Sequence, residues 1–139
     1  MLTVPKTAQP LLYDRPMLPE AAVGTRLVEA IAAQDVAGIA TCFAADAQFR
    51  ALVPPGLRER TGAPDAASLI AGWFADSTEL ELVDSETTTV GDRLHIAYRF
   101  VGVEEGEPYI VEQHLFGTLG DGKITRADLL CSGFLPRPE

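Results

Sequence analysis

The chain has 139 residues, 47% hydrophobic and 22% charged, which suits one globular domain with one core. Its 20 acidic and 11 basic side chains give a net charge of -9, which argues against nucleic acid and anionic membranes as partners. The sequence has no apolar run of about 18 residues and no basic-then-apolar leader, so it predicts a cytoplasmic protein without a membrane span.

Two helices are predicted ahead of the first strand. Residues 1–19 contain four prolines and no sustained periodicity, which indicates an extended N-terminal arm, followed by a single domain over residues 20–139. From Glu20 to about residue 34, apolar side chains recur every four positions, which is typical of a helix that buries one face. Asp35 is placed to cap a second helix.

A strand, a loop and a third helix follow. Residues 47–53 alternate between apolar and polar side chains and predict a short strand, which ends at Pro54 and Pro55. The polar residues 56–63 are interpreted as a loop. Pro64 suits the first turn of a helix with a strongly apolar face.

The remainder of the chain changes to an apolar period of two, which indicates strands. Four segments are separated by short turns rich in glycine, at residues 79–90, 93–103, 107–119 and 122–134. Short turns between long strands predict an antiparallel meander. Helices first and strands afterwards favour the α+β class over a parallel βαβ fold.

The order of these elements resembles a known superfamily. The segments LVEAIAAQDVAGIATCFAADAQF, at residues 27–49, and GDGKITRADLLCSGF, at residues 120–134, are similar to the nuclear-transport-factor-2-like superfamily, which includes SnoaL-like polyketide cyclases, ketosteroid isomerases and limonene epoxide hydrolases. The resemblance implies a cone-shaped curved antiparallel sheet wrapped by three helices, a cystatin-like α+β barrel. It further implies a ligand pocket at the open end of the cone and a homodimer, but no particular reaction.

The positions at which these enzymes carry catalytic groups are mostly apolar in this chain. Alignment without gaps places Ala51 at the carboxylate base of the ketosteroid isomerases and Leu27 at their phenolic donor. Counting back from the last Gly-Lys places His114 at their oxyanion acid. Leu129 stands where the cyclases and epoxide hydrolases have an acid, and the neighbouring Asp128 is expected to point away from the pocket.

Glu112 and His114 are the predicted polar centre. Two residues apart on one strand, they share a face and lie roughly 6 to 7 Å apart, close enough to act as an acid and base pair. The opposite face, with Val111, Gln113 and Leu115, is about as apolar, so the alternation leaves open which face points inward. Only the resemblance places His114 inward, and a structural, hydrogen-bonded histidine is the alternative.

The inward positions of the predicted elements are expected to form the wall of the pocket. They are Leu27, Phe43, Phe49, Ala51, Trp73, Phe74, Tyr98, Phe116, Ala127, Leu129 and Cys131. Arg50, Arg58 and Arg60 could hold a carboxylate at the mouth, or simply meet solvent. Nucleotide motifs and metal-ligand spacings are absent, so neither a cofactor nor a metal is expected, and both cysteines are expected to be free thiols.

These features leave three functions open. The first is binding of a small, mostly apolar molecule with cofactor-free proton transfer, as in isomerisation, cyclisation or hydration. The second is ligand binding without catalysis, which the missing acids at positions 51 and 129 favour. The third is a structural module. A homodimer is expected through the outer face of the sheet, to which Val101, Val111, Leu115 and Leu119 are assigned.

Overall fold

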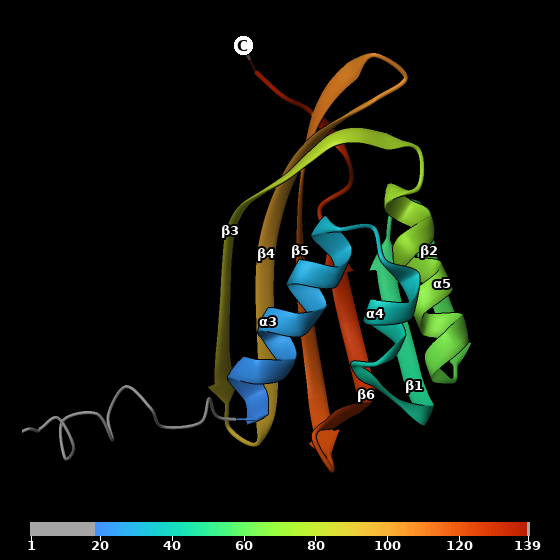
Figure 1. Cartoon of the computed structure of the whole chain (residues 1–139), viewed down its shortest axis with the longest axis vertical. Coiled ribbons are helices and arrows are strands. Elements are labelled where there is room, and N and C mark those ends of the chain that lie inside the picture. Colours follow the sequence, from blue (N-terminus) through green and yellow to red (C-terminus); the bar gives the residue numbers. More distant parts are fainter. Residues whose placement is uncertain (1–18, 139) are drawn as a thin grey trace, which may run out of the picture.

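The computed structural model describes residues 19–138, so the predicted arm lies outside the described residues except for Pro19, which begins a helix. Three helices lie on one side of a curved sheet (Figure 1). The helices are α3 (Pro19–Ala32), α4 (Val36–Ala40) and α5 (Ala63–Phe74). The strands are β1 (Phe43–Val53), β2 (Gly56–Thr61), β3 (Ser77–Val90), β4 (Arg93–Glu104), β5 (Glu107–Gly120), β6 (Lys123–Cys131) and β7 (Leu135–Pro136).

The helices form where the apolar periodicity predicts them. α3 buries Val23, Leu27 and Ile31, and the Asp35 side chain accepts a hydrogen bond of 3.0 Å from the backbone N–H of Gly38 at the start of α4. A Cβ atom at Gly24 would collide with the side chain of Thr87 on β3, so glycine allows α3 to approach the sheet closely.

The sheet has the order β2-β1-β6-β5-β4-β3, and β7 pairs with β5 beside this path. The predicted antiparallel meander is the run β3-β4-β5-β6, whereas β1 joins β6 in parallel. The sheet curves around the helices without closing into a barrel, which gives the cone (Figure 1). The fold is therefore α+β, with a curved sheet of seven strands and few helices.

The interpretation of residues 56–63 as a loop is wrong. Residues 56–61 form β2, an edge strand paired with β1 from Val53 opposite Gly56 to Gln48 opposite Thr61. The two intervening prolines make a tight turn, and the polar side chains of β2 are those expected on an edge strand with few buried neighbours. A polar strand of this kind has the same composition as a loop.

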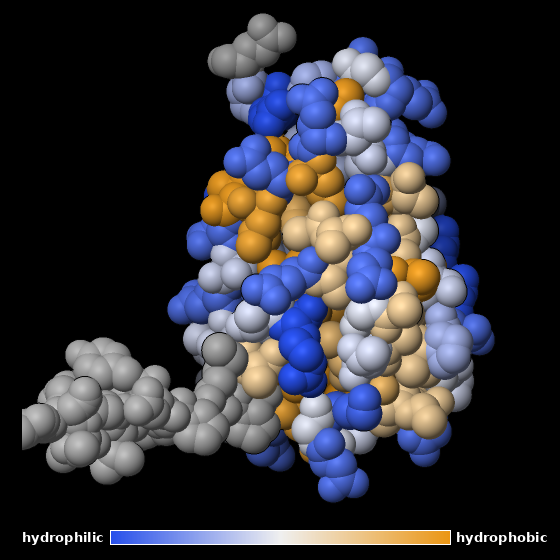
Figure 2. All heavy atoms as spheres, in the orientation of Figure 1, coloured by the Kyte–Doolittle hydropathy of each residue, from blue (hydrophilic) through white to orange (hydrophobic). Residues whose placement is uncertain are grey.

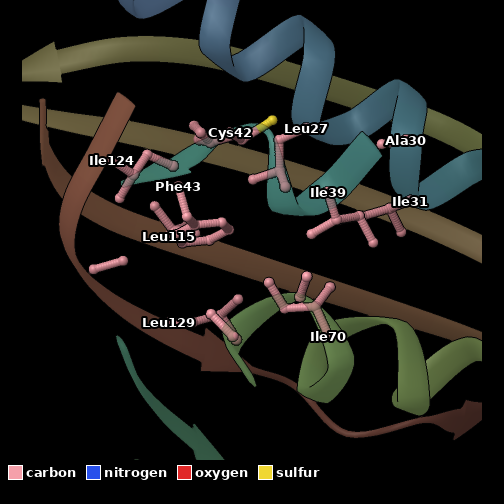
Figure 3. Close-up of a cluster of buried hydrophobic side chains, with 14 of the residues drawn as sticks. Leu27, Ala30, Ile31, Ile39, Cys42, Phe43, Ile70, Leu115, Ile124 and Leu129 are labelled. Atoms are coloured by element: carbon pink, nitrogen blue, oxygen red, sulfur yellow. The ribbon is translucent and has the colours of Figure 1, made fainter. Parts of the chain in front are cut away.

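The core fills the space between the helices and the concave face of the sheet. One hydrophobic cluster joins α3, α4 and α5 to β1, β4, β5 and β6, and Figure 3 shows Leu27, Phe43 and Leu129 within it. The surface that carries the helices has hydrophilic and hydrophobic side chains interspersed (Figure 2). No helix within residues 19–138 is long and apolar enough to cross a membrane.

Strand β5 faces the opposite way from the expectation. Its buried side chains are Tyr109, Val111, Gln113 and Leu115. They are on the same side of the sheet as the inward-facing residues of β4, because Gln113 pairs with the buried Tyr98. The assignment of Val111 and Leu115 to the outer face is therefore wrong. Leu119 also packs against the core, which leaves Val101 as the one residue of that assignment directed outward.

Candidate functional site

A cavity of about 820 Å³ opens at the end of the cone, where the β4–β5 hairpin meets the C-terminal segment. Its wall includes Val53, Trp73, Tyr109, Cys131, Phe134 and Pro136. We call it the mouth cavity. Phe134 packs edge-on against Tyr109, with ring centroids 4.9 Å apart, and against Phe74 of the core at 5.5 Å. These contacts fix the C-terminal segment as one wall of the cavity.

Tyr109 is held in this wall by two neighbours. Its hydroxyl lies 2.6 Å from the Ser77 hydroxyl, a buried hydrogen bond between β5 and β3. On the other side, a Cβ atom at position 102 would come within 2.6 Å of the same hydroxyl, so only Gly102 leaves room for the ring. Burial raises the pKa of Tyr109. The hydrogen bond with Ser77 lowers this pKa, and the negative charge of the nearby Glu104 raises it, so the net change is an increase.

A buried polar group lies next to the cavity, and sequence reasoning missed its central residue. Gln113 is fully buried, accepts a 2.6 Å hydrogen bond from the Tyr98 hydroxyl through Oε1, and donates through Nε2 to the Cys131 sulfur at 3.4 Å. Burial holds the pKa of Tyr98 far above its ordinary value, so the phenol stays protonated and donates. The signal was available, because counting outward from the turn at Gly106 pairs Gln113 with the inward-facing Tyr98.

The inner face of the sheet carries no acid at the positions where the enzymes that the sequence resembles place one. Ala51 and Leu129 face each other across β1 and β6, and both are buried. Leu27 is also fully buried in the core. Asp128 points outward as expected and pairs with Arg50 at 2.8 Å and with Arg93 at 3.2 Å. Arg50 is thus engaged away from the mouth cavity.

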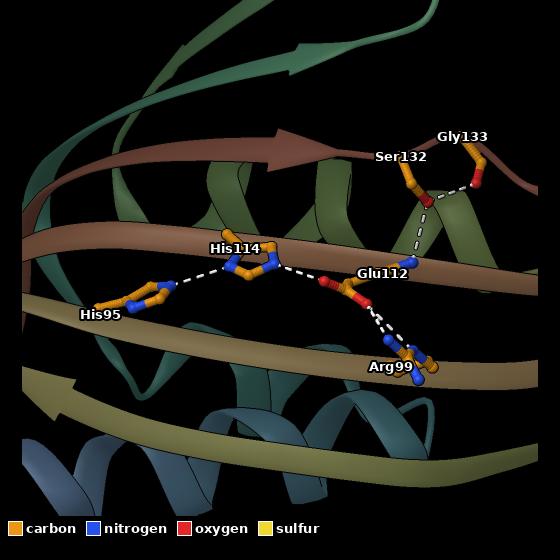
Figure 4. Close-up of polar contacts among 6 residues, drawn as sticks. All are labelled: His95, Arg99, Glu112, His114, Ser132 and Gly133. Atoms are coloured by element: carbon orange, nitrogen blue, oxygen red, sulfur yellow. Dashed lines mark hydrogen bonds and ion pairs between the residues drawn. The ribbon is translucent and has the colours of Figure 1, made fainter.

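His114 and Glu112 lie on the outer face of the sheet, the side away from the helices (Figure 4). The predicted inward orientation of His114 is wrong. The His114 Nε2 atom lies 2.7 Å from a Glu112 oxygen, while Arg99 donates to the other oxygen of that carboxylate at 2.6 and 3.0 Å. His95 Nε2 lies 2.9 Å from His114 Nδ1. Because the carboxylate only accepts, His114 donates to it through Nε2; in the tautomer with the proton on Nε2, the Nδ1 atom accepts from His95.

This chain of contacts changes two protonation equilibria. Hydrogen bonds from His114 and Arg99 lower the pKa of Glu112. Desolvation lowers the pKa of His95, and the neighbouring His114 lowers it further. The rings of His95 and Phe116 stack at 4.5 Å, which covers one face of the imidazole. The His114 and Glu112 side chains are 33% and 37% exposed, so the group is an outer-face network open to solvent.

The predicted pocket wall is divided among three places. Trp73 and Cys131 line the mouth cavity. Phe116 lies on the outer face, against the prediction, because it shares the side of His114. The others are packed together in the core instead of lining the mouth cavity, and Figure 3 labels Leu27, Phe43 and Leu129 among them; the full set is Leu27, Phe43, Phe49, Ala51, Phe74, Tyr98, Ala127 and Leu129. The cone is filled at its narrow end, and the open space lies at its mouth.

A second hollow, of about 540 Å³, lies on the outer face. It is bordered by Arg99, Glu112, His114, Leu130 and Leu135, and Cys131 borders both hollows. Within residues 19–138, no three His, Cys, Asp or Glu side chains gather into a group that could hold a metal ion.

Comparison with known proteins identifies the family. The family model described as "SnoaL-like domain" matches residues 25–127. A putative polyketide cyclase from Xanthomonas campestris is similar in structure, with a TM-score of 0.65, 21% identity and coverage of 81% of this chain and 89% of the other. A steroid delta-isomerase from Pseudomonas aeruginosa has a TM-score of 0.59 and 17% identity, and the match covers 89% of this chain and 83% of the other.

A further solved relative is a hypothetical protein from Catenulispora acidiphila with a ketosteroid isomerase-like fold, in complex with trimethylamine. Its TM-score is 0.64 at 19% identity, and the match covers 77% of this chain and 82% of the other. No curated protein sequence matches the chain. At these identities the structural relatives share the fold alone, whereas the family model spans most of the chain. The chain therefore belongs to the SnoaL-like domain family, and its curved sheet and three helices are the cone fold of that family.

Proposed function

We propose that this protein binds a small, mostly apolar molecule in the mouth cavity. The observation that carries the proposal is the cavity itself, which is of the size of small-molecule sites and has three aromatic side chains, Trp73, Tyr109 and Phe134, in its wall. The trimethylamine complex of the Catenulispora relative supports the use of this fold for small organic ligands.

Binding without catalysis is the function that the polar groups favour. The inward positions of the related enzymes' acids hold Ala51 and Leu129, and the acid and base pair predicted from the sequence lies on the outer face. For cofactor-free proton transfer, which is the catalytic alternative, the cavity offers the carboxylates of Glu104, Glu105 and Glu107 at its border. The free thiols support the cytoplasmic location expected from the sequence.

We also propose that two copies associate through the outer face of the sheet. Leu52, Leu57 and Leu130 are about half exposed and adjacent in register, and the equally exposed Leu135 lies opposite Ile110. Such a patch is more typical of an interface than of a surface in water. The ionic side chains beside it are already paired with one another, which reduces the cost of covering them.

The binding proposal is tested with N-phenyl-1-naphthylamine, a neutral probe that fluoresces in apolar sites. We expect saturable binding, quenching of the single tryptophan, Trp73, and loss of affinity in Val53→Trp, which fills the cavity. Phe134→Ala, which removes a wall, is the second variant. His114→Ala is the matched control, since it changes the outer hollow and should leave probe affinity unchanged. Probe binding that depends on His114 and not on Val53 or Phe134 would contradict the proposal. Circular dichroism checks that each variant folds.

A further inference from the structure

We infer that the mouth cavity selects a small organic cation, an ammonium group with apolar substituents. The inference rests on the proposed function and names the chemical class of its ligand. Glu104, Glu105 and Glu107 come from the β4–β5 hairpin, and all three border the cavity. A tight turn thus brings three carboxylates to one edge of an otherwise apolar opening.

These carboxylates have no cationic partner in residues 19–138. The ion pairs found in that range engage Glu112 and Asp128 on the outer face, and none involves the hairpin glutamates. No lysine or arginine belongs to the cavity lining, and Arg137, which directly follows the lining residue Pro136, forms no ion pair with any residue between 19 and 138. The negative potential of the rim is therefore left for a ligand to neutralise, and the net charge of -9 strengthens it.

The wall behind the carboxylates suits the same kind of ligand. Tyr109 and Phe134 pack edge to face at 4.9 Å, and Trp73 completes the aromatic part of the lining. Aromatic faces attract cations, and substituted ammonium ions combine a diffuse charge with an apolar surface that such a wall can cover. The Tyr109 hydroxyl is already engaged by Ser77, so its ring, rather than its oxygen, is what the residue offers.

Other ligand classes fit less well. An anion would meet three like charges at the rim, and a neutral apolar molecule would make no use of them. A metal ion prefers a close set of oxygen ligands, and no such group of side chains forms within residues 19–138. The combination of aromatic wall and acidic rim matches a cation with an apolar body.

The test compares choline with its neutral isostere 3,3-dimethyl-1-butanol, by displacement of the neutral naphthylamine probe at low ionic strength. We expect choline to bind at least about tenfold more tightly, and added salt to reduce the difference. The triple variant Glu104→Gln, Glu105→Gln, Glu107→Gln should bring the two affinities within about twofold while probe affinity is kept. The matched control is Asp46→Asn, Asp92→Asn, Asp121→Asn, which removes the same charge away from the cavity and should retain the preference.

Equal affinities for the two isosteres, or a preference that survives the glutamine variant, would overturn the inference. A preference lost equally in the aspartate control would also overturn it, because the effect would then come from net charge alone. Failure of the neutral probe to bind the unmodified protein would instead show that the proposed function itself is wrong.

Discussion

The buried pair of Tyr98 and Gln113 makes a sharp prediction about stability. Tyr98→Phe removes the hydroxyl that donates to Gln113 Oε1 at 2.6 Å, in a place where both residues are buried and water cannot replace the donor. An unsatisfied buried acceptor costs about 1–3 kcal/mol, so we expect the free energy of unfolding to fall by about 2 kcal/mol. Gln113→Leu strands the Tyr98 hydroxyl and should cost a similar amount.

The double variant distinguishes this account from a simple loss of packing. With Phe at 98 and Leu at 113, neither polar group is left unpaired. The loss in the free energy of unfolding of the double variant should therefore be smaller than the sum of the two single losses, by about 1–2 kcal/mol. Urea unfolding followed by circular dichroism and by Trp73 fluorescence measures the cycle. Tyr109→Phe is the control: its partner Ser77 has a hydroxyl that can turn to another acceptor, so the cost should be smaller. Single changes that add without coupling would refute the reasoning.

Three further properties can be measured directly. The folded state lowers the pKa of His95, so the unfolded chain binds that proton more tightly, and the free energy of unfolding should fall as the pH drops below about 6.5. His95→Gln should flatten this part of the urea-unfolding profile, and Glu112, whose pKa is also lowered, should add a second loss below about pH 4.3. Leu130→Glu should shift the sedimentation equilibrium toward the monomer, whereas Val36→Glu, at a similarly exposed site on α4, should not. A monomeric mass for the unmodified protein at micromolar concentration would contradict the proposed dimer. A thiol reagent should modify Cys131 quickly and Cys42 slowly, because Cys42 is fully buried and its burial raises the pKa of the thiol. Rapid reaction of both thiols in the folded protein would contradict the burial of Cys42.

Much of the fold follows from local sequence patterns. The spacing of apolar residues predicts α3 and α5, and the capping position of Asp35 predicts α4. The glycine-rich turns separate the four long strands. β2 could not be predicted in this way. Its side chains are mostly exposed, so its strand structure comes from pairing with β1 and not from a buried face.

The candidate site was harder to predict because it depends on which face of β5 is buried. Both faces of this strand carry apolar and polar residues in similar proportion, so alternation alone does not decide between Gln113 and His114. The neighbouring strand β4 decides which face of β5 is buried. One face of β4 is clearly apolar and includes Tyr98, and Tyr98 pairs with Gln113. The mouth cavity depends equally on a tertiary contact, the packing of Phe134 against Tyr109, for which no local pattern is a guide.

Cys131 borders both the mouth cavity and the hollow on the outer face. The proposed ligand site and the proposed interface between two copies are then separated by a single side chain, so thermodynamic linkage would apply if both events occur. One bound ligand that tightens association by about tenfold must itself be bound about tenfold more tightly by the associated form, because the coupling free energy is the same in both directions. Apparent ligand affinity can be plotted against protein concentration, and the slope of that plot would report the coupling. A Cys131 variant that changes this slope, but not the affinity of the monomer, would locate the coupling in that side chain.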